Sequence, residues 1–140
     1  MSAIIQKKEN GKIEVTFLSD WSKLESYLNN LKEQGKEFVV SSPNIDNLFF
    51  DAYDFDAETG AIINISDAKQ VWINHYRKAR TPLLAALDLE YMRADEDGNL
   101  ELKKEIAAKK QALRDVTKTD LPNTLEEIKA TWPEILGEKP

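Results

Sequence analysis

The first 17 residues contain two short apolar runs, Ala3 to Gln6 and Ile13 to Phe17. In the second run, apolar and polar residues alternate. Such runs are typical of strands with one buried face. Between them stands Asn10-Gly11, which supplies the two positive-φ residues of a tight primed turn. The pattern therefore predicts a β-hairpin.

A helical spacing follows this hairpin. Ser19 or Asp20 can cap the start of the helix, and Gly35 can end it. Intervals of three and four residues place four apolar side chains on one face, namely Trp21, Leu24, Leu28 and Leu31. After the helix, Phe38 to Val40 is predicted to form a strand.

A second hairpin is predicted from Leu48 to Phe55 and from Ala61 to Ile65, with a turn through Glu58-Thr-Gly60. Asp51 should lie on the opposite face from Phe50. The pattern predicts a small α+β domain over residues 1–65, in which one helix packs on an antiparallel sheet.

The periodicity becomes helical from residue 66 to the C-terminus. Ser66 or Asp67 is the predicted cap. Apolar residues then recur at helical spacing, at Val71, Trp72, Tyr76, Ala79, Leu83, Leu87 and Tyr91.

Pro82 interrupts this helical pattern. A proline has no N–H to donate to the carbonyl of Lys78, and its ring clashes with that carbonyl, so an uninterrupted straight helix would cost about 3 kcal/mol. With Thr81 as cap and Pro82 at the first helical position, we expect one helix over 67–80 and another over 82–94, at an angle to it.

The next segment should return alongside this bent helix. Residues 95–99 are predicted to form a turn, and residues 100–114 a helix with Leu102, Ile106 and Leu113 facing inward. Its lysines, Lys103, Lys104, Lys109 and Lys110, should face mostly outward.

Thr124 to Glu127 is a capping box for a short helix that ends at Trp132-Pro133, and the residues after it should be frayed.

The predicted fold class is therefore α+β. A small N-terminal antiparallel sheet with one packed helix is followed by a kinked helix and an antiparallel helical hairpin. The predicted boundary divides residues 1–65 from a helical region of residues 66–140.

Composition and charge restrict the classes of function that the chain can have. The net charge of -6 argues against binding nucleic acid, because neutralising phosphates needs a basic surface. The chain has no apolar run long enough to cross a membrane and no N-terminal segment typical of a targeting signal. It contains no cysteine, which excludes disulfides and thiolate sites and fits an intracellular origin.

Few residues suggest catalysis, a cofactor or a metal. His75 is the only histidine, and Gly-rich phosphate loops and nucleophile elbows are absent. Residues 95–106 resemble a calcium loop, but glycine stands at the fourth position and Ile106 at the twelfth, where a glutamate is needed. Residues 54–65 fail similarly at Ile65. We therefore predict no catalytic residue, no cofactor and no metal site, although a pair of carboxylates for glycan hydrolysis stays open.

The main local charge anomaly is a group of cations at Lys69, Arg77, Lys78 and Arg80. We favour a solvated helix face over a dedicated partner site, because exposed ion pairs contribute little. Trp72 and Tyr76 lie beside these cations in the sequence. Aromatic residues at this spacing more often belong to a core, but they would be anchors for a partner if exposed.

Three segments resemble the C-terminal region of tail fibre assembly and related tail-associated proteins of bacteriophages. They are Arg77-x-x-Arg80-x-x-Leu83-Leu84-x-x-x-Asp88, Lys110-Gln-Ala-Leu-Arg-Asp-Val116 and Trp132-Pro133. The resemblance covers residues 69–135, but the returning arm lacks the aromatic residues that commonly precede Gln-Ala-Leu-Arg in that family, and the N-terminal half matches no motif.

The resemblance implies a non-enzymatic protein that binds the tail fibre or another tail component in the host cytoplasm, in some cases staying on the virion tail. The candidate partner-binding residues are Trp72, Tyr76, Arg77, Arg80, Arg114 and Trp132. The alternatives are a permanent structural or adaptor protein of the tail or baseplate, and, less favoured, a small carboxylate-dependent hydrolase. A homo-oligomer is left open.

Overall fold

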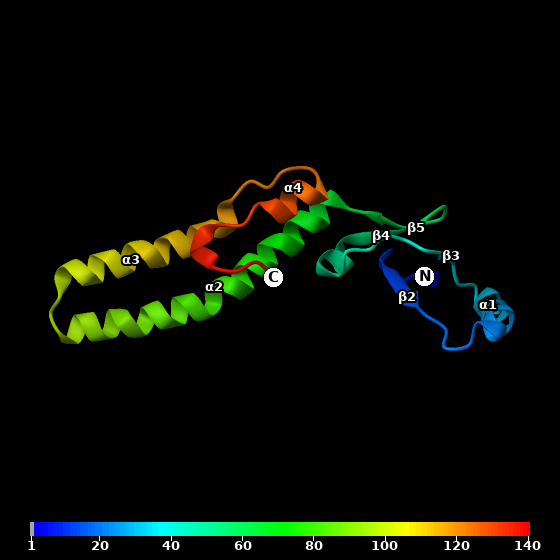
Figure 1. Ribbon diagram of the computed structural model, residues 1–140, viewed down its shortest axis with the longest axis horizontal. Coiled ribbons are helices and arrows are strands. Elements are labelled where there is room, and N and C mark those ends of the chain that lie inside the picture. Colours follow the sequence, from blue (N-terminus) through cyan, green and yellow to red (C-terminus); the bar gives the residue numbers. More distant parts are fainter. Residues whose placement is uncertain (1) are drawn as a thin grey trace. The chain divides into compact units, whose positions relative to one another are not determined.

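The computed structural model describes residues 2–140, and its contacts divide the chain into two compact units, one up to Ala68 and one from Lys69 onward. Their boundary falls three residues after the predicted one. It lies within the first turn of the helix α2 (Ile65–Glu96). Figure 1 shows the order of the elements along the chain. The fold is α+β, as predicted.

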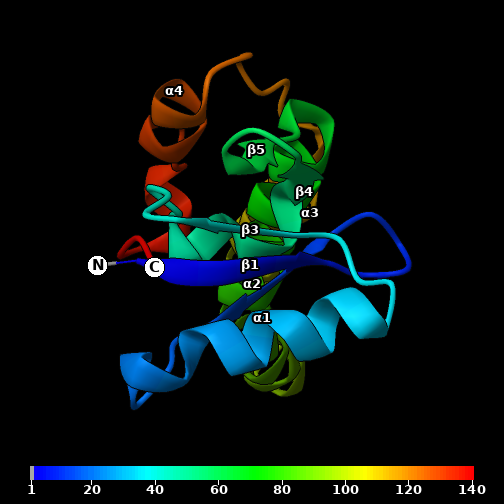
Figure 2. The same ribbon diagram turned by 90° about the vertical axis from the view of Figure 1, so that its right-hand side faces the viewer.

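The first unit is built on a three-stranded antiparallel sheet in the order β2-β1-β3, formed by β1 (Ala3–Lys7), β2 (Ile13–Thr16) and β3 (Phe38–Ser41). The predicted first hairpin and third strand are thus confirmed. The central strand is buried almost throughout, because both of its faces are covered. Figure 2 shows α1 on one side of this sheet and the β4–β5 hairpin on the other.

The turn of the first hairpin differs from the prediction. The Gly11 N–H donates to the carbonyl of Lys8, and only Gly11 has a positive φ, of 81°. Asn10 instead accepts a hydrogen bond from the N–H of Lys12 with its side chain. The wider turn therefore needs one left-handed residue, whereas a primed turn needs two.

The helix of the first unit begins with a 3₁₀ turn (Trp21–Lys23) and continues as α1 (Leu24–Glu33). The Asp20 side chain accepts from the N–H of Ser22, which confirms one of the two predicted caps, and Gly35 follows the helix with a φ of 68°. Leu31 is buried as predicted. Trp21 is exposed, so the prediction that it lies on the buried face with Leu31 was wrong. The reason is that the 3₁₀ turn, with three residues per turn, changes the direction in which its side chains point.

The second hairpin is shorter than predicted. It consists of β4 (Tyr53–Asp56) and β5 (Gly60–Ile63), whereas Asn47–Ala52 forms a 3₁₀ helix. The Asp46 side chain caps that helix by accepting from the N–H of Leu48. This local hydrogen bond gives the backbone an alternative to strand pairing, which explains why the apolar run before β4 is not extended.

The second unit is a helical hairpin with a C-terminal segment folded along it (Figure 1). The helix α2 pairs with α3 (Leu100–Asp115), and α4 (Leu125–Ala130) follows a 3₁₀ turn (Val116–Lys118). The cap of α2 is the side chain of Asn64, which accepts from the N–H of Asp67, so neither predicted cap is used. The predicted cap of α4 is confirmed, because the Thr124 hydroxyl accepts from the N–H of Glu127.

The predicted restart at Pro82 does not occur, since α2 is one helix of 32 residues with Pro82 inside it. Thr81 is helical and does not cap a second helix. Its hydroxyl donates to the carbonyl of Arg77 at 2.8 Å. Pro82 is exposed, so the carbonyl of Lys78 lies on a solvent-facing side of the helix, where water can replace the missing N–H donor.

Paired side chains join the two arms of the hairpin. Lys103 bonds Asp95 at 2.6 Å and Lys110 bonds Asp88 at 2.5 Å, and both ammonium groups lie 5.4 Å from the ring centre of Tyr91. The predicted outward position of these two lysines was therefore wrong, whereas Lys104 and Lys109 are exposed.

Apolar side chains are buried between the arms, among them Ala94, Ile106 and Leu113. Leu102 was expected inward but is exposed near the tip of the hairpin, where its neighbour Lys103 is the side chain that reaches α2. None of the helices formed by residues 2–140 combines the length and the apolar character needed to cross a membrane.

Candidate functional site: the aromatic and arginine cluster of the helical unit

Three of the candidate residues meet in one aromatic cluster, defined by Trp72 and Tyr76 of α2 and by Trp132 after α4. The Trp132 ring centre lies 5.4 Å from that of Trp72 and 5.3 Å from that of Tyr76, both edge to face. This arrangement places the positive edge of one ring on the negative face of another. Residues about sixty positions apart in the sequence therefore form one packed group.

The cluster is held by hydrogen bonds to the backbone of the C-terminal segment. The indole N–H of Trp72 donates to the carbonyl of Thr131 at 2.8 Å, and the Tyr76 hydroxyl donates to the same oxygen. The indole N–H of Trp132 donates to the carbonyl of Gly137 at 2.9 Å. Burial raises the pKa of the Tyr76 hydroxyl, although its hydrogen-bonded contact with Trp72 opposes that shift.

The cluster changes the interpretation of Trp72 and Tyr76. Both side chains are completely buried, so they are not exposed anchors in this conformation. Trp132 is half-buried. The residues after α4 are also ordered by packing, because Glu134–Leu136 forms a 3₁₀ turn and Leu136 is buried, so the predicted fraying was wrong.

Arg80 connects α2 with the end of α3. Its guanidinium donates to the carbonyl of Arg114 at 3.0 Å and to that of Leu113 at 3.4 Å, and it lies 3.5 Å from the Thr117 hydroxyl. The last carbonyls of a helix lack partners within the helix and carry a partial negative charge, so a cation there is stabilising. Arg80 thus serves the fold of the unit by this contact.

The remaining candidate cations are at the surface. Arg77 is exposed and donates to the side-chain oxygen of Asn74 at 2.7 Å, and the side chain of Arg114 is exposed on α3. Lys69 donates to Asn123 at 2.7 Å, whereas Lys78 is exposed. Of the six candidate partner-binding residues, Arg77 and Arg114 are those that offer an exposed side chain to another molecule.

Sequence reasoning did not single out the exposed apolar residues. In the first unit, Phe17 borders an apolar pocket of about 460 Å³. Its lining is Ala3, Val15, Phe17, Pro43, Ile45, Asn47 and Phe50. In the helical unit, Leu89, Met92 and Leu100 are exposed. Their spacing along α2 and α3 was visible in the sequence, but only the packing of the hairpin shows which face is left uncovered.

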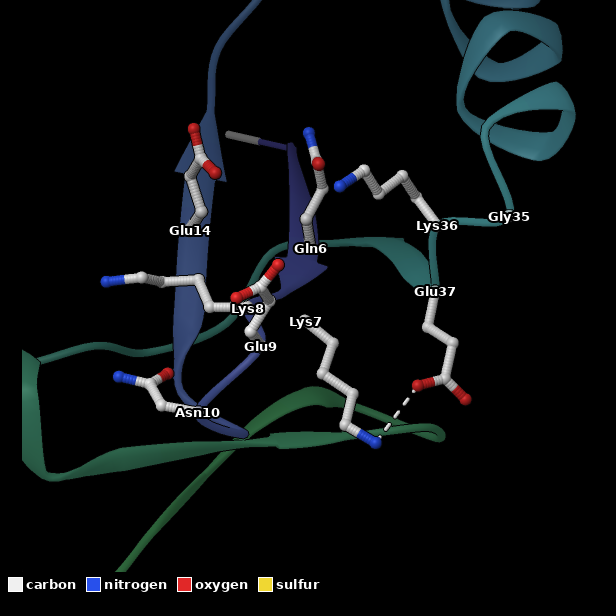
Figure 3. A pocket seen from close by; sticks show the side chains of 9 residues that line it. All are labelled: Gln6, Lys7, Lys8, Glu9, Asn10, Glu14, Gly35, Lys36 and Glu37. Atoms are coloured by element: carbon white, nitrogen blue, oxygen red, sulfur yellow. Dashed lines mark ion pairs between the residues drawn. The ribbon is translucent and has the colours of Figure 1, made fainter.

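A larger open hollow in the first unit, of about 900 Å³, is lined almost entirely by polar side chains (Figure 3). Lys7 forms an ion pair with Glu37 at 3.0 Å at its rim, and the Gln6 amide donates to the hydroxyl of Tyr27 at 3.3 Å. The charges of both signs around it do not favour a ligand of one charge.

A partly exposed ion-pair group in the first unit joins the turn of the first hairpin, β4 and the start of α2. The Lys12 ammonium bonds Asp54 at 2.7 Å and also bonds Asp67. Burial alone would lower the pKa of Lys12, but the hydrogen bonds to both carboxylates outweigh burial and raise it. Hydrogen bonds from Lys12 and then Asn64 hold the pKa of Asp54 below its usual value.

The carboxyl groups with displaced pKa values bear on the hydrolase alternative. The pKa is lowered at Asp20, Asp54, Asp56 and Asp115, each time first by a side-chain hydrogen bond to the ionised form. A general acid needs a raised pKa instead, so that its carboxyl group keeps its proton near neutral pH.

Within residues 2–140, no three His, Asp or Glu side chains gather in a way that could hold a metal ion.

Comparison of the chain with protein-family models, with curated proteins and with solved structures gave no match.

Proposed function

We propose that this protein is a non-enzymatic bacteriophage tail protein that binds the tail fibre or a neighbouring tail component and acts in assembly or attachment of the fibre. The proposal rests on the resemblance of residues 69–135 to tail fibre assembly proteins. The observation that supports it most is the convergence of the resembling segments. Arg80, the Leu113-Arg114 backbone and Trp132 all take part in the contacts that close the helical unit.

This convergence gives the shared residues a physical role. Arg80 holds the end of α3 against α2, and Trp132 holds the C-terminal segment against the same helix. Residues that make these internal contacts hold the helical unit together, and the exposed side chains of the unit are available to a partner. The proposed binding residues are therefore Arg77 and Arg114, whereas Trp72, Tyr76, Arg80 and Trp132 support them.

Exposed apolar side chains support an interaction function. Phe17 and Leu100 are each more than half exposed, at 59% and 68%. Burying a large apolar side chain contributes about 1.5–3 kcal/mol, so a large apolar side chain that is left at the surface can contribute to binding another protein.

The experiment is co-expression of the full chain with the tail fibre protein of the same phage. We expect a soluble, trimeric fibre and a complex that can be isolated with this chain. Reversing both exposed charges, in Arg77→Glu with Arg114→Glu, should weaken the complex while leaving the buried cluster intact. Lys104→Glu is the matched control, because Lys104 is exposed on α3 and belongs to no resembling segment. A fibre that is equally soluble and trimeric without this chain, and that never binds it, would refute the proposal.

The alternative of a permanent tail or baseplate component makes a different prediction about the virion. A transient assembly factor is lost before the particle is complete, whereas a structural component is present at a fixed copy number. Quantitative mass spectrometry of purified particles separates the two.

A further inference from the structure

The helix α2 carries two faces with heptad spacing. The inner face consists of Arg80, Leu84, Leu87, Tyr91 and Ala94, at intervals of four, three, four and three residues. It is directed to α3, as shown by the contacts of Arg80 and Tyr91 and by the burial of Ala94. A second face, which we name the outer seam, has the same kind of spacing. It consists of Lys78, Pro82, Ala85, Leu89, Met92 and Glu96.

The outer seam is uncovered within the helical unit. All six of its residues are exposed, and the large side chains at its centre, Leu89 and Met92, are 49% and 60% exposed. The side of a surface helix that faces solvent is ordinarily polar. Apolar residues at intervals of three and four are typical of a helix that packs along another helix. The inner face already has its helix, α3, and the outer seam has none in this unit.

The order of residues along the seam indicates which helix fits it. Suppose that two copies of α2 pack antiparallel about a twofold axis at the level of residue 87. Each residue then faces the residue of the other copy that lies equally far from position 87 on the opposite side, so the two residue numbers sum to 174. These pairs are Ala85 with Leu89, Pro82 with Met92, and Lys78 with Glu96 of the other copy. Each small or compact residue meets a large one, and each cation meets an anion. A twofold interface requires this kind of self-complementarity.

We infer that the outer seam is a dimer interface, on which a second copy of this chain packs its own α2 antiparallel. The seam runs over 19 residues from Lys78 to Glu96, and its 18 residue steps give a length of about 27 Å at ~1.5 Å per step. Ala86 lies next to the seam and is exposed, which lets the two backbones approach closely. Asp88 also lies near the seam, but its charge is already paired with Lys110 of the same chain at 2.5 Å.

A parallel arrangement fits less well. It would place Lys78 beside Lys78 and Glu96 beside Glu96, and it would set Ala85 against Ala85, which leaves a gap, and Leu89 against Leu89. Like charges that face each other are destabilising, and so are voids. The antiparallel arrangement avoids both. This inference is independent of the proposed tail function, because it uses only the packing of α2.

The test is sedimentation velocity of the full chain from about 1 to 200 µM. We expect the 16.0 kDa chain to form a species of twice that mass as its concentration rises. Ala85→Glu places a charge against Leu89 of the other copy and should weaken dimerisation by about tenfold or more. Ala108→Glu is the matched control, since Ala108 is exposed on α3 outside the seam and should have no effect. Far-UV circular dichroism verifies that each variant is folded.

Charge exchange decides the direction of packing. Lys78→Glu alone and Glu96→Lys alone should each weaken the dimer by about three- to tenfold, because each sets like charges opposite one another at both ends. The double variant should recover the original affinity. An equimolar mixture of the two single variants should also recover it, as a heterodimer in which every pair is again of opposite charge.

The inference is overturned if the chain stays monomeric over the whole concentration range, in which case the seam serves another molecule or none. It is also overturned if a dimer forms that Ala85→Glu does not weaken. Failure of both the double variant and the mixture to recover affinity would refute the antiparallel packing.

Discussion

The shared acceptor of the aromatic cluster leads to a quantitative prediction about stability. Trp72 and Tyr76 both donate to the carbonyl of Thr131. Tyr76→Phe removes one donor from a completely buried ring and should lower the free energy of unfolding by about 0.5–1.5 kcal/mol. Trp72→Phe removes the other donor and part of the ring, which should cost about 1–3 kcal/mol.

The double variant should cost more than the sum of the two single variants. After either single change, the Thr131 carbonyl keeps one donor. After both changes it has neither, and an unsatisfied carbonyl costs about 1–3 kcal/mol when buried. Because Thr131 is half-buried and water can reach it in part, we expect an excess near the lower end, about 1 kcal/mol.

The assay is urea denaturation followed by far-UV circular dichroism, since removal of a tryptophan alters fluorescence. The control pairs Trp72→Phe with Tyr91→Phe, a ring of the same helix that contacts Lys103 and Lys110 and lies outside the cluster. For this distant control pair, the losses in free energy of unfolding of the two single variants should sum to that of the double variant within about 0.5 kcal/mol. If the Trp72 and Tyr76 changes are as additive as that control pair, then the shared carbonyl does not couple them and the account of the cluster fails.

Three further predictions concern the two units. Pro82→Ala should raise the free energy of unfolding by about 1–3 kcal/mol, because it restores an N–H donor within the continuous helix α2; a loss of stability in urea would show that Pro82 is needed there. Gly60→Ala should destabilise by about 2 kcal/mol more than the control Gly98→Ala, since both have a positive φ but only at Gly60 would the new methyl lie 2.5 Å from a side-chain carbon of Ile5; equal melting temperatures would contradict this. Asp54→Asn should cost about 0.5–1 kcal/mol at pH 7, a modest value because the carboxylate is 39% exposed. Since folding lowers the pKa of Asp54 below 3.8, this difference should be constant above about pH 5 and vanish as the pH falls through the folded-state value; a difference that grows in acid would be inconsistent with the ion pair.

Much of the local structure could be predicted from the sequence. The caps at Asp20 and Thr124 were identified correctly because a capping hydrogen bond joins residues two or three positions apart. The first hairpin, the strand β3 and the helix α3 follow from short-range periodicity in the same way. Some local errors occurred where a side chain offered the backbone another partner, as Asp46 does before the second hairpin and Asn64 does at the start of α2. The predicted break at Pro82 was wrong for a different reason, because an exposed proline can lie inside a continuous helix.

The candidate site was only partly predictable. The sequence placed Trp72, Tyr76, Arg80 and Trp132 among the candidate partner-binding residues, and it left open whether Trp72 and Tyr76 are core or surface. A helical period identifies which residues share a face, and it does not identify the element that covers that face. The packing of the C-terminal segment decided that Trp72 and Tyr76 are buried, and the end of α3 decided that Arg80 turns inward.

The sequence by itself thus determined the first hairpin, the strand β3, the helices α1 and α3 and the caps at Asp20 and Thr124, because these depend on hydrogen bonds and side-chain spacing within a few residues. Only the tertiary structure decided which faces are covered, where Lys12 finds its carboxylates, and that the outer seam of α2 is left exposed. Burial is a property of residues far apart in the chain that meet in space, so it depends on how whole elements pack.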